Sequence, residues 1–365
     1  MVSMTLLTPL NATLMNLINS KVGIFSDPHY GVHRNSETWH KIALEHAKWA
    51  AEQFKLQGIK DIIIPGDIFH DRNDIAVNTL HMVTDVFDIL RDFNIIVTVG
   101  NHDAYYRDNS SVNSVSILRG WSNITVIDTL TVETLQGKKI AFCPWGQDIN
   151  AVPKCDLIVG HFEINSFKMN TFKVCTNGLK SSELTDRAPL TITGHFHHRE
   201  ERKYERGTIL YVGCPYQQDW GDYSTTKGLY ILDLDTLKYE FIENTISPRY
   251  NKIKYSEIAN GVYTAESLKG FIRSNIVKFY IDKQLTPEVV DNIVRKLASI
   301  KPVELTLEYD YSEASKLNIN EANTKDFNIS IENSISEFID LLEVNHKDKV
   351  KTYVTDLYHR ALTIT

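Results

Sequence analysis

The sequence predicts an α+β fold in which two β-sheets pack as a sandwich between helices, followed by a small β-α-β unit and a helical hairpin. Three observations support this. Five short apolar runs each end in polar residues, the stretch 207–245 alternates as β-strands do, and the composition shifts after Pro248. The 365 residues are enough for one large domain and a smaller one.

Each apolar run is followed at once by residues that can bind a metal ion or move a proton. The clusters are Asp27-Pro28-His29, Gly66-Asp67, Gly100-Asn101-His102-Asp103, Gly160-His161 and Gly194-His195-Phe196-His197. In open α/β sheets, functional groups gather at the carboxyl ends of strands. Carboxylate, amide and imidazole groups without a thiolate suit manganese, iron(II) or magnesium better than structural zinc. We therefore expect a metal site where five strands end.

Taken singly, each cluster has an ordinary structural explanation. Asp27 could cap a helix, His29 could be a packed histidine, and Gly66-Asp67 could form a turn. The five clusters nevertheless all follow apolar runs, and this joint pattern makes a coincidence remote.

Two helices are expected between the first three strands. Ser36 can cap a helix that runs to about Gln57, with Gly58 as its stop. A second helix is expected over about 75–92, and its apolar residues cover about half of its circumference. It therefore either packs under other parts of its own domain or also contacts a second subunit. Three histidines that lie outside the clusters are interpreted as surface or packing residues: His33, His40 and His46.

The middle of the chain is expected to supply the remaining strands. Residues 124–142 predict a hairpin around Gln136-Gly137, and the polar stretch 163–187 predicts a loop over the site. Three further strands are expected at 208–212, 228–232 and 238–242.

After Pro248 the pattern predicts separate smaller elements. A strand at 276–281, a helix starting at Thr286-Pro287-Glu288 and a strand at 302–311 form a β-α-β unit. Two amphipathic helices follow a polar linker, and they either dock onto a partner or fold back on the preceding unit. The expected segments are an extension at 1–17, a main domain at 18–248, a small domain at 249–312, a linker at 313–329 and a helical segment at 330–365.

Composition limits the functional classes. The formal net charge of −7 argues against a protein that holds nucleic acid by bulk electrostatics, although bound cations and a basic partner would offset it. None of the four cysteines forms a C-x-x-C pair, which favours a reduced cytoplasmic setting. No run approaches the ~20 apolar residues that span a bilayer. Residues 1–17 make a poor secretory signal.

The series D-x-H, G-D, G-N-H-D, G-H and G-H-x-H resembles the signature of the calcineurin-like metallophosphoesterases, over roughly residues 21–245. Within them the chain is most similar to DNA-repair and recombination nucleases: bacterial SbcD, its phage counterparts, and the eukaryotic and archaeal double-strand-break nuclease. Three stretches carry this similarity, at 27–31, 66–71 and 211–215. The resemblance implies a four-layer α/β/β/α sandwich with a small capping domain.

The resemblance also implies a set of site residues. One metal ion would be held by Asp27, His29, Asp67 and His197, and the other by Asp67, Asn101, His161 and His195. Manganese is the first choice for both ions, with magnesium or iron(II) as alternatives. Two such ions ~3.5–4 Å apart can activate one water for in-line attack on phosphorus.

Three further residues receive catalytic roles from the resemblance. His102 would protonate the leaving ribose oxygen, and Asp103 would orient its ring. His70 would contact the phosphate or assist the leaving group. Alternatively, His70 holds Asp71 or Asp67 by a hydrogen bond.

The implied function is that of a DNA exonuclease or endonuclease subunit in recombination, repair or replication. It would act with an SbcC-like ABC ATPase in the cytoplasm, that of the host if a phage encodes it, as a homodimer through the helix at 75–92. The sequence has no Walker A motif, so any ATP-driven step needs a partner. Two alternatives remain: another metallophosphoesterase, such as a cyclic-nucleotide phosphodiesterase or protein phosphatase, and a non-catalytic scaffold. The capping domain and helical tail argue against the first, and the complete ligand set argues against the second.

Overall fold

The computed structural model describes residues 20–310, 339 and 346–362. The expected extension at 1–17, the linker at 313–329 and most of the first hairpin helix lie outside the described residues. The chain divides into two units, Met1–Glu308 and Tyr309–Thr365, and each is described by itself.

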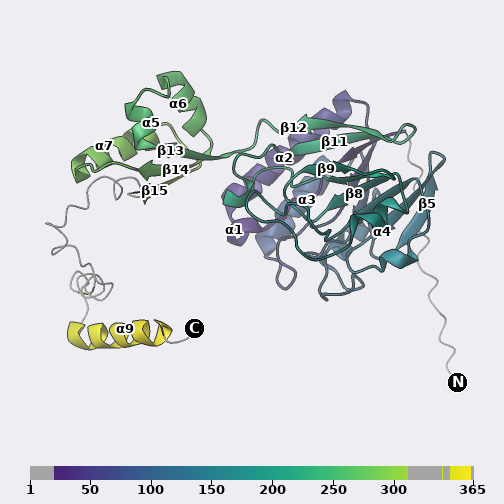
Figure 1. Ribbon diagram of the computed structural model, residues 1–365, viewed down its shortest axis with the longest axis horizontal. Helices are drawn as coiled ribbons and strands as arrows, with labels where there is room; N and C mark the ends of the chain where they lie inside the picture. Colours follow the sequence, from purple (N-terminus) through teal and green to yellow (C-terminus); the bar gives the residue numbers. More distant parts are fainter. Residues whose placement is uncertain (1–19, 311–338, 340–345, 363–365) are drawn as a thin grey trace. The chain divides into compact units, whose positions relative to one another are not determined.

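Two six-stranded mixed sheets form the centre of the first unit (Figure 1). In the first sheet, four parallel strands are flanked on one side by two antiparallel strands. In spatial order these are β12 (Lys238–Glu243), β11 (Gly228–Asp233), β1 (Lys21–Ile24), β2 (Asp61–Ile64), β3 (Asn94–Thr98) and β4 (Ile124–Ile127).

The second sheet has four parallel strands with one antiparallel strand at each edge. In spatial order these are β5 (Thr131–Leu135), β6 (Lys138–Cys143), β7 (Leu157–His161), β8 (Leu190–Gly194), β10 (Thr208–Tyr211) and β9 (Glu200–Lys203). The five strands that lead into the predicted metal site are all parallel strands of these sheets: β1, β2, β3, β7 and β8.

Side chains that alternate along the strands build the core between the sheets. On β2, Ile63 packs in the core that joins the sheets, while Ile62 and Ile64 pack in the core under the helices. Val159 and Ile192 of the second sheet belong to the same inter-sheet core as Ile63. A strand with two buried faces has this pattern because successive side chains point to opposite faces. The predicted sandwich is confirmed.

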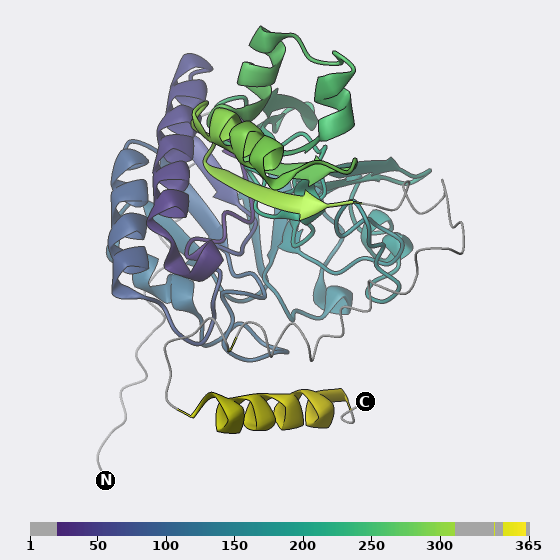
Figure 2. The ribbon, with the colours of Figure 1, turned by 90° about the vertical axis from the view of Figure 1, so that its left-hand side faces the viewer.

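Two helices cover the outer face of the first sheet, and Figure 2 shows them side by side. They are α2 (Glu37–Leu56) and α3 (Val77–Ile89). Ser36 occupies the N-cap position of α2, but its side chain makes no capping hydrogen bond. A shorter layer on the second sheet contains α4 (Ser181–Thr185), whose Leu184 is buried with Phe162 and Phe167. These layers together give an α+β four-layer arrangement.

The predicted hairpin is present but shorter. Gln136 and Gly137 both have left-handed backbone angles, as the tight turn between β5 and β6 requires. Residues 124–127 instead form β4, which pairs in parallel with β3 in the other sheet. The chain crosses between sheets at 128–130, and a local alternation pattern carries no signal for that change of partner.

The smaller elements at the end of the first unit form a three-stranded sheet, in the order β13-β14-β15, with three helices. The predicted β-α-β unit is β14 (Ile276–Ile281), α7 (Pro287–Ala298) and β15 (Glu304–Tyr309). Three elements were missed: β13 (Tyr250–Lys254), α5 (Tyr255–Ala259) and α6 (Ala265–Ile272). In β13 only Tyr250 and Ile253 are buried, so its apolar pattern is weak.

The second unit contains α9 (Lys347–Leu362), which corresponds to the second predicted hairpin helix.

Short helical turns of the first unit are α1 (Val32–Asn35), η1 (Ser114–Gly120), η2 (Ile149–Ala151) and η3 (Trp220–Asp222). Among the described residues, no helix combines the length and apolar character that a membrane span requires.

His33, His40 and His46 contribute to packing, as expected. The ring of His33 stacks on Trp39 with centroids 4.3 Å apart, and His40 Nε2 lies 3.1 Å from Thr79 Oγ1. His46 is fully buried, and its ring nitrogens have no hydrogen-bond partner among the described residues. Burial lowers the pKa of His46 to about 3.

His46 should therefore make folding less favourable in acid. Between the unfolded pKa, ~6.5, and the folded value of about 3, only the unfolded chain binds this proton. In the unmodified protein, this proton should lower the unfolding free energy by up to ~1.4 kcal/mol for each pH unit below ~6.5. We expect the variant His46→Phe to lack this dependence on pH. Urea denaturation of both proteins at pH 7.5 and pH 5 measures this difference. If the unfolding free energies of the two proteins differed by the same amount at both pH values, the prediction would be contradicted.

Candidate metal centre

The turns that follow five parallel strands bring the seven predicted ligand residues together. Asp27 and His29 follow β1, Asp67 follows β2, Asn101 follows β3, His161 ends β7, and His195 and His197 follow β8. Metal-binding atoms of Asp27, His29 and Asp67 lie within 4.8 Å of one another, as do those of Asp67, His161 and His195. Two clusters of possible ligands thus meet at Asp67.

Asp67 is the buried centre of this arrangement. Its Oδ2 atom lies 3.5 Å from His29 Nε2 and 3.3 Å from His161 Nε2. Its Oδ1 atom accepts a hydrogen bond of 2.8 Å from the backbone N–H of His102. Burial opposes ionisation of Asp67, but the charge of His161 holds the pKa of this carboxyl well below its usual range.

Asn101 joins the two imidazoles of the second cluster. Its Oδ1 atom lies 2.9 Å from His161 Nε2 and 2.7 Å from His195 Nδ1. The other ring nitrogen of His161 donates to the carbonyl oxygen of Pro65 at 2.7 Å. That bond keeps a proton on Nδ1, so Nε2 is the atom of neutral His161 that can bind a metal.

The first cluster contains buried polar atoms that lack partners. His29 Nε2 and His197 Nε2 are 2.9 Å apart. Asp27 Oδ1 accepts the backbone N–H of His195, but Asp27 Oδ2 is buried and has no hydrogen-bond partner among the described residues. An unpartnered buried carboxylate oxygen is costly, and a bound cation would compensate for it.

Burial and neighbouring charges shift the pKa values of the site residues. Burial, reinforced by the charge of Asp67, raises the pKa of Asp27 to about 7. Burial lowers the pKa of His195 to about 3 and that of His29 well below its usual range, so both rings are neutral and keep a lone pair. Burial opposes protonation of His161, but Asp67 raises its pKa to about 9. Two carboxylates, one amide and four imidazoles fit two divalent cations.

Four of the ligand residues have left-handed backbone angles that are unfavourable for non-glycine residues. The φ angles are 55° at Asp27, 47° at His29, 54° at Asp67 and 91° at His195. Such residues each cost ~1–3 kcal/mol and concentrate at functional sites. Gly100 meets a related constraint, because a Cβ atom there would lie 2.1 Å from Asp67 Oδ1. The turns are therefore shaped to bring the ligands together.

The predicted catalytic residues lie beside the first cluster. The rings of His29 and His102 have centroids 4.7 Å apart, and those of His70 and His102 stack at 5.8 Å. His102 Nδ1 donates to the backbone carbonyl of His70 at 2.6 Å. His70 thus supports His102 through its backbone, a contact that the sequence did not indicate.

Asp103 differs from the expectation. Its carboxylate is buried and accepts the backbone N–H groups of Phe69 and Gly100, each at 3.0 Å. Burial raises its pKa to about 6. The ring of His102 takes its orientation from the His70 carbonyl instead, and Asp103 ties together the two turns that carry Asp67 and Asn101.

Sequence reasoning missed a buried ion pair beneath His197. Lys227 Nζ lies 2.6 Å from Asp222 Oδ1 and donates to the carbonyl oxygen of His197 at 2.5 Å. Asp222 Oδ2 accepts the backbone N–H of Gln218 at 2.9 Å and contacts Cys214 Sγ at 3.5 Å. Both charged side chains are at most 3% exposed. Their only sequence signal is two charges five residues apart, which says nothing about burial.

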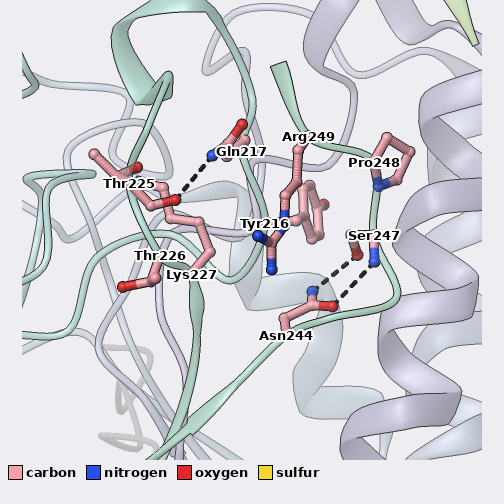
Figure 3. A pocket seen from close by; sticks show the side chains of 9 residues that line it. All are labelled: Tyr216, Gln217, Thr225, Thr226, Lys227, Asn244, Ser247, Pro248 and Arg249. Carbon is pink, nitrogen blue, oxygen red and sulfur yellow. Dashed lines mark hydrogen bonds between the residues drawn. The ribbon is translucent and has the colours of Figure 1, made fainter. Parts of the chain in front are cut away.

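The segment that carries this pair also supports the Asp27 turn. Gln218 Nε2 donates to the backbone carbonyl of Asp27 at 2.7 Å, and the Tyr216 hydroxyl donates to that of Pro28 at 2.8 Å. Figure 3 shows the pocket that Tyr216 and Lys227 help to line. Its cavity of about 10 Å³ has room for no more than one water, so this region is a support rather than a ligand site.

Comparisons with known proteins show the family to which the chain belongs. The model of the calcineurin-like phosphoesterase family matches residues 20–210. The chain is 27% identical over 317 residues to exonuclease subunit 1 of Enterobacteria phage T4, covering 80% of this chain and 87% of that protein. It is 23% identical over 210 residues to phosphoesterase 078R of Invertebrate iridescent virus 3, covering 54% of this chain and 59% of that protein. A solved structure of an archaeal phosphodiesterase aligns with a TM-score of 0.36 at 16% identity, covering 61% of this chain and 99% of that one.

Asp67→Asn should weaken binding of two metal ions at once, because this carboxylate touches both clusters. The loss of metal affinity should exceed the ~10–100-fold loss that follows removal of a hydrogen-bond partner of a ligand. Calorimetric titration with Mn²⁺ measures it, with Asp71→Asn, an exposed carboxylate on the same turn, as the matched control. Two tight sites remaining in Asp67→Asn would contradict a shared ligand.

Lys227→Met should destabilise the fold, because it leaves the Asp222 carboxylate buried without a counter-charge. Breaking a buried pair in this way costs ~3–5 kcal/mol. Arg206→Met is the matched control, since the Arg206–Asp186 pair is exposed and worth at most ~1 kcal/mol. Urea denaturation compares the two variants. If both variants lost the same small amount of unfolding free energy, the Asp222–Lys227 pair would not be needed for stability.

Proposed function

Because this chain belongs to the calcineurin-like phosphoesterase family, we propose that it is a metal-dependent DNA nuclease subunit that hydrolyses phosphodiester bonds. The observation that carries this proposal is the pair of ligand clusters that share the buried carboxylate of Asp67. Similarity over 80% of the chain to a phage exonuclease subunit supports a nuclease function.

We assign one ion to Asp27, His29, Asp67 and His197, and the other to Asp67, Asn101, His161 and His195, with manganese as the first choice. The unpartnered Asp27 oxygen and the neutral imidazoles of His29 and His195 support this assignment. When bound, the two ions would supply positive charge for the phosphoryl oxygens and lower the pKa of an attacking water.

His102 is proposed as the general acid. Its Nδ1–H is held by the His70 carbonyl, so Nε2 is the ring atom left to give a proton to the leaving ribose oxygen. The hydrogen bond from its backbone to Asp67 keeps this ring next to the shared carboxylate. The side chain of His70, stacked on His102 and exposed, is proposed to contact the substrate phosphate. Asp103 is proposed as a positioning residue that holds the Asn101 turn.

The proposed subunit works with a partner. The net charge of −7 gives the chain little attraction for DNA, and it has no Walker A motif. We propose an SbcC-like ABC ATPase that binds the segment 330–365, of which α9 is the described part. Dimerisation through the region of α3 is proposed because Val77 at its start is 82% exposed. We also propose the domain boundaries that the sequence predicts. We further propose that the protein acts in the cytoplasm during recombination or repair.

One assay separates this proposal from its alternatives. The purified chain is incubated with Mn²⁺, Mg²⁺ or Fe²⁺ and either labelled linear duplex DNA, a cyclic nucleotide, bis(p-nitrophenyl) phosphate or a phosphomonoester. We expect nucleotide release from DNA that EDTA abolishes. Hydrolysis of the small esters alone would point to another phosphoesterase, and no hydrolysis at all would favour a scaffold.

If His102 is the general acid, its replacement should lower the rate of hydrolysis by different factors for substrates with different leaving groups. His102→Ser should keep both metal ions and lower the rate of DNA hydrolysis by ~10²–10⁴-fold. The loss should be much smaller for bis(p-nitrophenyl) phosphate, because p-nitrophenolate leaves without a proton. Steady-state kinetics with both substrates, together with Mn²⁺ titration, test this. Equal losses on the two substrates would remove His102 as the acid, and a lost metal ion would make it a ligand.

A further inference from the structure

The segment 104–113, here called the Tyr105 loop, follows directly after the turn that carries Asn101 and His102. An isolated bridge pairs Ala104 with Asn113, and the backbone N–H of Tyr105 donates to the Val112 carbonyl at 2.9 Å. The backbone N–H of Ala104 also donates to the Gly100 carbonyl at 3.1 Å. The base of the loop is therefore attached to the metal centre itself.

The middle of the Tyr105 loop is anchored as well. Trp145 Nε1–H donates to the Arg107 carbonyl at 2.8 Å, and a Cβ atom at Gly146 would lie 2.5 Å from the Asp108 carbonyl oxygen. The Trp145 ring has its centroid 5.1 Å from that of His195 and 6.0 Å from that of His161. The loop and the second ligand cluster thus pack against the same tryptophan.

Although the backbone is held, two aromatic side chains of the loop remain open to solvent. Tyr105 is 54% exposed and Tyr106 is 47% exposed, and their rings meet edge to face with centroids 5.1 Å apart. Arg107, which follows them, is also exposed. Neither ring belongs to a core cluster of the described residues. Rings on an anchored backbone lose little entropy when they bind a flat ligand.

We propose that Tyr105 and Tyr106 form a stacking surface for an unpaired nucleobase next to the phosphodiester that the metal centre cleaves. This inference rests on the proposed nuclease function and adds the form of the substrate. Every base has a π-face, so tyrosine rings bind single strands with little sequence preference. Arg107 supplies the cation that a neighbouring phosphate requires.

The proposed surface favours single-stranded or frayed DNA over an intact duplex. In the interior of a duplex, each base is stacked between its neighbours and paired, so it has no free face for a tyrosine ring. A base becomes available when the strand end opens. The anchored loop then holds that base at the edge of the ligand clusters, where the adjoining phosphate lies close to His102.

Binding is tested with the full chain, a fluorescein-labelled oligothymidylate and a blunt duplex, in EDTA to prevent hydrolysis. Fluorescence anisotropy should show tighter binding of the single strand. For the double variant Tyr105→Ala/Tyr106→Ala, the Kd for the single strand should rise by about 5- to 150-fold per stacked base. Tyr105→Phe/Tyr106→Phe should bind like the unmodified chain, because a phenyl ring also stacks. Tyr353→Ala, which removes a tyrosine of α9 that is 65% exposed, is the matched control.

Three results would overturn the stacking surface. The first is an unchanged Kd in the alanine variant, and the second is equal binding of duplex and single strand by the unmodified chain. The third is an oligomeric state of the alanine variant that differs from that of the unmodified chain in size-exclusion chromatography. The last would make the loop a contact between copies of the chain. Calorimetric titration with Mn²⁺ should give the same affinities in the alanine variant as in the unmodified chain. A weaker affinity there would show a damaged metal centre and would overturn the assignment of the loss to stacking. If the strand binds through the tyrosines but Mn²⁺ brings no cleavage, the nuclease function fails while the stacking surface stands.

Discussion

The buried carboxylate of Asp67 is the constraint on which the rest of the structure depends. It lies within 3.5 Å of imidazole nitrogens from two different sheets, at His29 and His161. A carboxylate in such a place is stable only while positive charge and hydrogen-bond donors surround it. The strand ends of both sheets converge at this point and supply the imidazoles of His29 and His161 and the amide of Asn101.

The unfavourable backbone angles of the ligand turns depend on the packed sandwich around them. Isolated turns with left-handed φ at Asp27, His29 and Asp67 would relax, but these turns follow buried parallel strands that cannot shift. The segment from Cys214 to Lys227 contributes from behind through its contacts with the Asp27 turn and the His197 carbonyl. Precise placement of the ligands thus depends on residues outside the two ligand clusters.

Several parts of the fold could be predicted because their causes are local in the chain. The helix after Ser36 has a start signal, an apolar face and a glycine stop, and the hairpin at Gln136-Gly137 has a turn that few other residues form. The strand β13 and the Asp222–Lys227 pair escaped prediction for the opposite reason. Their stability comes from distant partners, such as β14 and the His197 carbonyl, that no spacing of residues reveals.

The sequence by itself determined which residues could take part in the site, since each candidate follows directly after a strand and strand ends converge in this kind of sheet. Only the tertiary structure decided how they are held. It assigned Asp103 to two backbone amides, gave the orientation of His102 to the His70 carbonyl, and left Tyr105 and Tyr106 exposed on an anchored loop. Hydrogen-bond partners and exposure depend on which segments meet in space, and the order of residues along the chain does not contain that information in readable form.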